Sequence, residues 1–160
     1  MGSPAIAKTR SALRAKRSKI AVHDLQRAVP VNVADLERFA AKALASCLRI
    51  RRPKPTDLTK LHEIFVLLVS DRRMASLHRQ FLQEPGPTDV LTFQHGEIFI
   101  SAETAKRHAR RFGNSLQQEL RLYVVHGLLH LHGFDDRNEI EATEMEKMQQ
   151  RVLRRLPRLN

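Results

Sequence analysis

The most informative stretch of this 160-residue chain reads Val125-His126-Gly127-Leu128-Leu129-His130-Leu131-His132-Gly133-Phe134-Asp135-Asp136. Apolar periodicity predicts a helix over residues 115–131, and this helix carries His126 and His130 four positions apart. That spacing places both imidazoles on one face, one turn from each other. Gly133 then ends the helix and lets the chain turn back, which brings Asp136 within reach of the same face.

These three side chains form a candidate metal site. Imidazole nitrogens and carboxylate oxygens both bind zinc, at about 2.0–2.2 Å. We therefore expect His126, His130 and Asp136 to hold one ion, and three protein ligands leave a fourth position open, as in catalytic zinc sites. Zinc is the expected cofactor, although the same ligands accept other divalent transition metals such as nickel, iron or cobalt.

Other interpretations of the same residues stay open. A histidine pair at this spacing is common on an ordinary polar helix face, but the leucines and valines around this pair indicate a buried helix, where an imidazole needs a partner. Asp135 competes with Asp136 as the third ligand, and either acid is an alternative cap for the last helix. His132 follows His130 by two residues, so we expect it to face away, as a surface histidine or one that supports the ligands.

The rest of the chain predicts one α+β domain over residues 19–160. Strands are expected at residues 19–25, 63–70, 89–94 and 97–101, the last two joined by a tight turn at His95-Gly96. Helices are expected at residues 33–47, 71–81, 102–112, 115–131 and 137–156. Together they predict a small mixed sheet of about four strands packed with about five helices.

Charge and composition narrow the class of protein. Lys and Arg number 28 against 17 Asp and Glu, a net charge of +11 that favours a polyanionic partner such as nucleic acid, unless it reflects genome composition. The longest apolar run, residues 64–69, is too short to span a bilayer. The single cysteine, Cys47, excludes an intramolecular disulfide. We interpret residues 1–18 as a basic, disordered arm; phosphate contact and a transit peptide are the alternatives.

Three blocks of this sequence resemble the YbeY family. Residues 126–135 are similar to its signature H-G-x-L-H-L-x-G-[YF]-D-H, residues 87–93 to P-T-D-V-L-S-F, and residues 96–101 to G-[DE]-I-x-I-S. The blocks occur in the family order, and the resemblance extends over about residues 19–156. Members are bacterial and organellar metal-dependent endoribonucleases linked to ribosomal RNA maturation and ribosome quality control. The resemblance implies a cytoplasmic, zinc-dependent, single-strand-specific endoribonuclease whose partners are ribosomal RNA and the ribosome or its proteins.

Two positions depart from the family pattern. The third family ligand is a histidine, and Asp136 occupies that slot; a carboxylate lowers the charge of the site and weakens the metal as a Lewis acid. The family usually has an arginine six residues before the threonine of P-T-D-V-L, where this chain has Leu82, and Arg79 is the candidate substitute. The resemblance places Asp89 near the site, although holding the local turn is its simpler role.

Two rival functions remain. Leu82 and Asp136 favour a ribosome-assembly or RNA-binding factor with a structural metal and little or no nuclease activity. The spacing of the ligands also matches an extended metalloprotease pattern, but Gly127 stands where that pattern has its general base. Only seven Phe and one Tyr are present, so we expect RNA binding to rely on the backbone rather than on base stacking.

Overall fold

The computed structural model describes residues 17–83 and 88–158, so nearly all of the expected basic arm lies outside the described residues. The strands are β1 (Lys19–Asp24), β2 (Glu63–Val69), β3 (Val90–Phe93) and β4 (Glu97–Ser101). The helices of the described residues are α1 (Val33–Leu48), α2 (Asp57–Lys60), α3 (Asp71–Leu82), α4 (Ala102–Phe112), α5 (Leu116–Leu131) and α6 (Glu139–Arg155). The predicted α+β class is confirmed.

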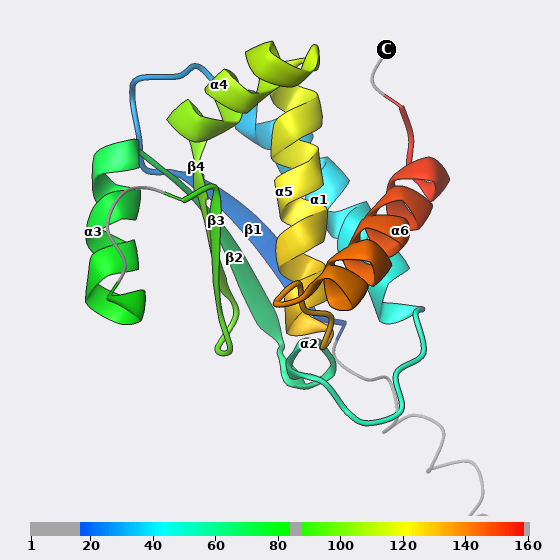
Figure 1. The fold of residues 1–160 in the computed structure, drawn as a ribbon. Coiled ribbons are helices and arrows are strands. Elements are labelled where there is room, and N and C mark those ends of the chain that lie inside the picture. The colour runs from blue at the N-terminus through cyan, green and yellow to red at the C-terminus, as the bar shows by residue number, and fades with distance from the viewer. Residues whose placement is uncertain (1–16, 84–87, 159–160) are drawn as a thin grey trace, which may run out of the picture.

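The four strands form one mixed sheet in the order β1-β2-β4-β3 (Figure 1). β1, β2 and β4 are parallel, and β3 returns antiparallel to β4 as the outer strand of a hairpin. Parallel strands in mid-sheet are normally covered on both faces. The near-continuous apolar sequence of β2 agrees with that position.

Helices cover both faces of the sheet. α1, α5 and α6 pack on one face and enclose the larger core, whereas α3 covers the other with a smaller cluster (Figure 1). β4 serves both, because Ile98 and Ile100 belong to the larger core and Phe99, between them, to the smaller one. None of the helices in residues 17–83 and 88–158 is long and apolar enough to cross a membrane.

Side-chain caps define where the helices begin. Asn32 caps α1 and Ser70 caps α3, each through a side-chain oxygen that accepts a backbone amide of the first turn. Asn138 caps α6, so the proposed capping role of Asp135 or Asp136 is wrong, and the helix begins at Glu139 rather than at residue 137. α2 was not predicted, because four residues are too few to show a helical period.

Helix α5 packs closely against the sheet at Gly127. A Cβ atom added to Gly127 would lie 2.6 Å from Cγ2 of Ile98 on β4, well inside van der Waals contact. Ile98 is fully buried in the larger core, where side chains are closely packed. The glycine between the two candidate ligands therefore permits the close approach that sets the histidine face of α5 beside the edge of the sheet.

Candidate metal centre

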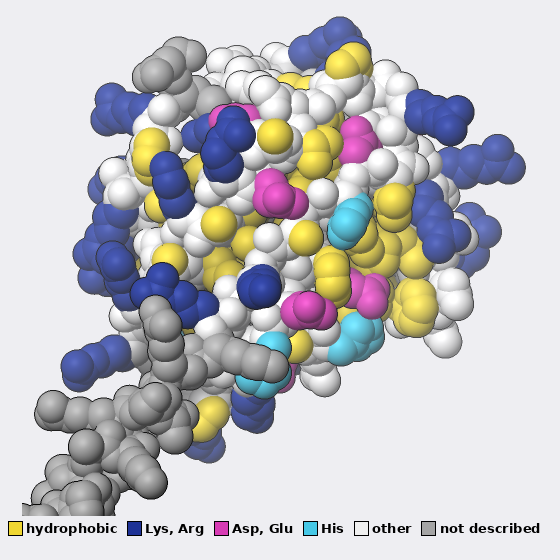
Figure 2. Space-filling view, turned by 180° about the vertical axis from the view of Figure 1, so that it is seen from behind, with side chains coloured by type: hydrophobic (Ala, Val, Ile, Leu, Met, Phe, Trp, Pro, Cys, Tyr) yellow, Lys and Arg dark blue, Asp and Glu magenta, His cyan; other side chains and the backbone are white. Residues whose placement is uncertain are grey.

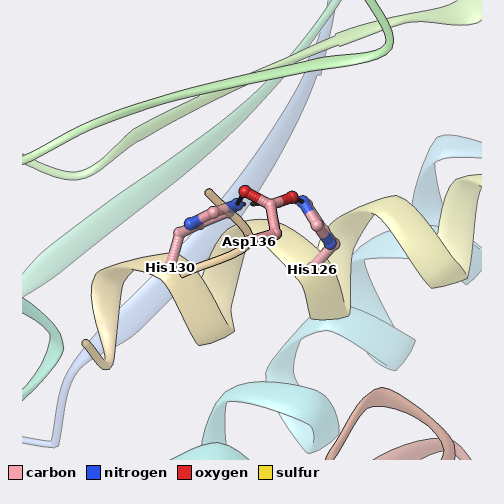
Figure 3. Close-up of side chains that lie close together, drawn as sticks. All are labelled: His126, His130 and Asp136. Carbon is pink, nitrogen blue, oxygen red and sulfur yellow. Dashed lines mark hydrogen bonds and ion pairs between the residues drawn. The ribbon is translucent and has the colours of Figure 1, made fainter. Parts of the chain in front are cut away.

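The structure brings His126, His130 and Asp136 together (Figure 3). Their ligand atoms all lie within 4.8 Å of one another. The two Nε2 atoms are 2.9 Å apart, and the Asp136 oxygens lie 3.4 Å from Nε2 of His126 and 3.7 Å from Nε2 of His130. Ligands at about 2.0–2.1 Å from a tetrahedral zinc ion are themselves roughly 3.3 Å apart, so these separations fit a single ion.

The turn after α5 explains how a loop carboxylate reaches a helix face. Gly133 has a φ of +88°, a left-handed conformation that glycine adopts without strain. Its amide donates to the carbonyl of His130 at 3.0 Å, and the amide of Phe134 donates to that of Leu129. These hydrogen bonds close a turn that reverses the chain direction and places Asp136 beside the histidines of α5.

Gln149 of α6 supports the site from the other side. Its Oε1 is the hydrogen-bond partner of Nδ1 of His126, and because an amide oxygen only accepts, this contact favours the tautomer whose Nε2 is free to face the other two candidate ligands. Its amide nitrogen donates to Glu146 at 3.0 Å, which fixes the orientation of the amide. Sequence reasoning missed Gln149. The available signal was a polar residue on the buried face of α6, between Met145 and Val152.

The surroundings favour the metal-binding form of His130. Burial lowers the pKa of this imidazole, and the neighbouring His126 lowers it further, while Asp136 and Asp135 act in the opposite direction. The ring therefore stays neutral to lower pH than a free histidine, and a neutral imidazole is the form that binds a metal. Both histidine side chains are about one quarter exposed, and Asp136 is 43% exposed, so the centre opens to solvent on the carboxylate side.

His132 faces away from the centre, as its spacing predicts, but the prediction of a surface position is wrong. Only 1% of the residue is exposed, because the loop after α1 covers it. Nδ1 lies 2.9 Å from the hydroxyl of Thr56, and Nε2 lies 2.7 Å from the carbonyl oxygen of Ile50. His132 thus fastens the end of α5 to residues 50–56.

Asp135 and Asp89, the two other acidic residues considered for the site, have local partners instead. Asp135 forms a 2.7 Å ion pair with Arg137 and accepts the amide of Asp136, and it does not belong to the cluster of ligand atoms. Asp89 accepts the amide of Val90 at 2.8 Å and the hydroxyl of Thr88, the bonding expected of a residue that holds the start of a strand.

A groove of about 370 Å³ opens beside His130. Strand β3, the end of α5 and the turn at Gly133 form its walls, and Leu82 and Arg137 are among its lining residues. Arg79 is not among them and is exposed on α3, so the structure does not support it as a substitute for the family arginine. Thr92 also lines the groove, and within the described residues its buried hydroxyl has no hydrogen-bond partner.

Comparison with known proteins gives a consistent family. The family model described as Endoribonuclease YbeY matches residues 21–157. A protein of that name from Thermobifida fusca is 36% identical over 139 residues, which are 75% of this chain and 84% of that protein. Another from Synechococcus is 41% identical over 116 residues, covering 62% and 70%. The solution structure of TM1509 from Thermotoga maritima superposes with a TM-score of 0.56 at 27% identity, covering 83% of this chain and 85% of that one.

Proposed function

Because the chain belongs to the YbeY endoribonuclease family, we propose that it cleaves single-stranded RNA at a zinc centre formed by His126, His130 and Asp136. RNA-cleaving hydrolase activity comes with the family. The observation that carries the zinc assignment is the convergence of two imidazole nitrogens and a carboxylate on one point beside an open groove. Following the family resemblance, we further propose that the substrate is ribosomal RNA and that the enzyme acts in the cytoplasm, in ribosomal RNA maturation and ribosome quality control.

Each side chain has a defined part in this proposal. A bound zinc ion would supply a Lewis acid that polarises a phosphoryl oxygen and increases the acidity of a hydroxyl group. His126 and His130 would bind it through Nε2, and Gln149 keeps the proton of His126 on Nδ1. The carboxylate of Asp136 completes the set and lowers its net charge.

The preference for single strands rests on shape and charge. The deep groove of an A-form duplex hides its bases from side chains, whereas a single strand can lie along a protein surface. The net charge of +11 favours contact with phosphates, and the scarcity of aromatic residues argues against extensive base stacking.

Leu82 supports a second candidate function. It lines the groove where the family usually presents an arginine, and Arg79 does not replace that group there. A protein that has lost this phosphate contact could act as a ribosome-assembly or RNA-binding factor, with the metal serving only to hold the turn after α5.

Cleavage of labelled single-stranded RNA, measured together with zinc content, distinguishes the two functions. We compare wild type with His126→Ala/His130→Ala, and use the same RNA annealed to its complement as the duplex control. The proposed function predicts about one zinc per wild-type chain and cleavage that falls to background in the double variant. Equal residual cleavage in both proteins, with zinc retained by wild type, would favour the assembly factor. A zinc content near zero in wild type would contradict the site.

A further inference from the structure

A second groove, of about 380 Å³, lies between the end of α1 and helix α6. Its lining is strongly basic, and among the described residues that form it Glu144 is the single acid. The arginines are Arg49, Arg51, Arg52, Arg151 and Arg155. Lys and Arg side chains also crowd the left-hand part of the face drawn in Figure 2, the side on which α1 and α6 lie.

Most of these arginines have no protein partner. In the part of the chain that the structure describes, the exposed guanidinium groups of Arg49, Arg51, Arg151 and Arg155 make no ion pair or hydrogen bond. Four arginines elsewhere in the described residues do have acidic partners, and Arg107 with Asp71 is one example. Like charges gathered on one surface repel each other unless an anion lies between them, so the arrangement favours a polyanionic ligand.

The basic groove is continuous with the metal centre. Phe134 lines both this groove and the groove beside His130. Arg52, on the boundary, lies 3.9 Å over the ring of Phe134, and with Gly133 it also lines a third hollow between the two. A linear ligand that occupies the groove beside His130 therefore needs to cross only the turn at Gly133 and Phe134 to reach the arginines.

We propose that the basic groove binds the phosphates of the same RNA strand that enters the metal centre, an inference that rests on the proposed function. A linear polyanion spans both grooves, and the planar fork of arginine matches phosphate oxygens. An acidic protein could match the arginines, but it has no reason to continue into a groove that ends at metal ligands. The site also gives the RNA cations in a protein that has Leu82 in place of the family arginine.

The dependence of RNA affinity on salt tests this assignment. We compare wild type with Arg151→Gln/Arg155→Gln, measuring the anisotropy of a labelled 2′-O-methyl single strand, an RNA analogue chosen to report binding alone. Arg72→Gln/Arg73→Gln removes the same charge from exposed positions on α3, across the sheet. Arg151→Lys/Arg155→Lys keeps the charge, thermal melting checks folding, and a cleavage assay on ordinary RNA runs in parallel.

Arg151→Gln/Arg155→Gln should weaken RNA binding about 20-fold near 0.1 M salt. It should also make the slope of log K against log salt concentration shallower by about 1.4, because each phosphate contact on a single strand contributes about 0.7 to that slope. The α3 pair and the lysine pair should stay near wild type. Equal losses of affinity in the α3 and α6 glutamine variants, or no RNA binding by wild type, would overturn the proposed role of the basic groove in RNA binding. In that case, cleavage by wild type would still uphold the proposed function. If wild type failed to cleave while the slope difference persisted, the proposed nuclease would be wrong and the RNA-binding groove would stand.

Discussion

The guanidinium of Arg52 donates a hydrogen bond to the carbonyl oxygen of Gly133, 3.0 Å away, although the two residues are 81 positions apart. The same group lies over the ring of Phe134. The turn that carries the chain from His130 to Asp136 is therefore held by a segment that precedes β2. The geometry of the proposed metal ligands depends on this long-range contact as well as on the local sequence.

Removing Arg52 should loosen the third ligand. In Arg52→Ala the Gly133 carbonyl loses its donor and Phe134 its cation, so we expect zinc affinity to fall by about 10-fold, the lower end of the effect of groups that orient ligands. Competition with a chelating dye measures it. Arg51→Ala, at the exposed neighbouring position, is the control. Equal affinities in the two variants would show that Arg52 does not position the turn.

Gln149 should matter for metal affinity more than for folding. Gln149→Leu keeps a side chain of similar size but leaves Nδ1 of His126 without its acceptor. We expect zinc to bind 10–100-fold more weakly. Gln150→Leu, one position along on the exposed face of α6, should bind zinc as wild type does. An unchanged zinc affinity in Gln149→Leu would show that Gln149 does not support the proposed metal site.

The carboxylate ligand should limit catalysis. Asp136→His replaces an anionic ligand with a neutral one and raises the charge at the metal by one unit, so we expect cleavage to accelerate by roughly tenfold at unchanged zinc content. Glu139→His removes the same charge from an exposed position at the start of α6, outside the groove beside His130, and should leave the rate unchanged. A slower Asp136→His enzyme with full zinc content would contradict this electrostatic argument.

Gly127 should resist substitution although alanine is the better helix former. Gly127→Ala gains about 1 kcal/mol in helix propensity but forces a methyl group against Ile98. Since the buried side chain of Ile98 or the helix must shift to admit the methyl group, we expect a net loss of about 1–2 kcal/mol and a melting temperature lower by several degrees. Gly113→Ala has open space around its Cβ position, so any loss there comes from its positive φ alone. A Gly127→Ala protein as stable as wild type would show that α5 can shift away from the sheet.

Asp71 should make stability depend on acid pH. Burial alone would raise the pKa of its carboxyl, but hydrogen bonds from Arg107, Ser101 and Thr104 outweigh burial and lower it. The folded state then binds its proton less readily than the unfolded state. This contribution to stability is present above about pH 4 and disappears as the pH falls through the lower folded-state pKa.

Asp71→Asn isolates that contribution. The variant should melt below wild type at neutral pH, by an amount that reflects about 1–3 kcal/mol for charged hydrogen bonds. The difference should shrink as the pH falls below about 4, because wild type then loses what the variant already lacks. A constant difference from neutral to acid pH would show that the charge of Asp71 contributes nothing.

The sequence predicts those parts of the molecule that depend on local patterns. All four strands and the five long helices follow from apolar periodicity, and most of their ends fall within one residue of the predicted ones. The histidine pair follows from helical geometry alone. The sequence does not predict the roles of Gln149 and Arg52 or the burial of His132. These features arise where α6 and residues 50–56 fold back on α5, and apolar periodicity carries no information on such long-range contacts.

The position of Gln149 also has a consequence for biosynthesis. A ribosome makes the chain from its amino end, so His126 and His130 emerge before the residue that sets the tautomer of the first. Asp136 follows them, and α6 comes after all three. A nascent protein halted before α6 would carry the proposed metal ligands without their final support, and the centre would reach full affinity only after α6 has been made.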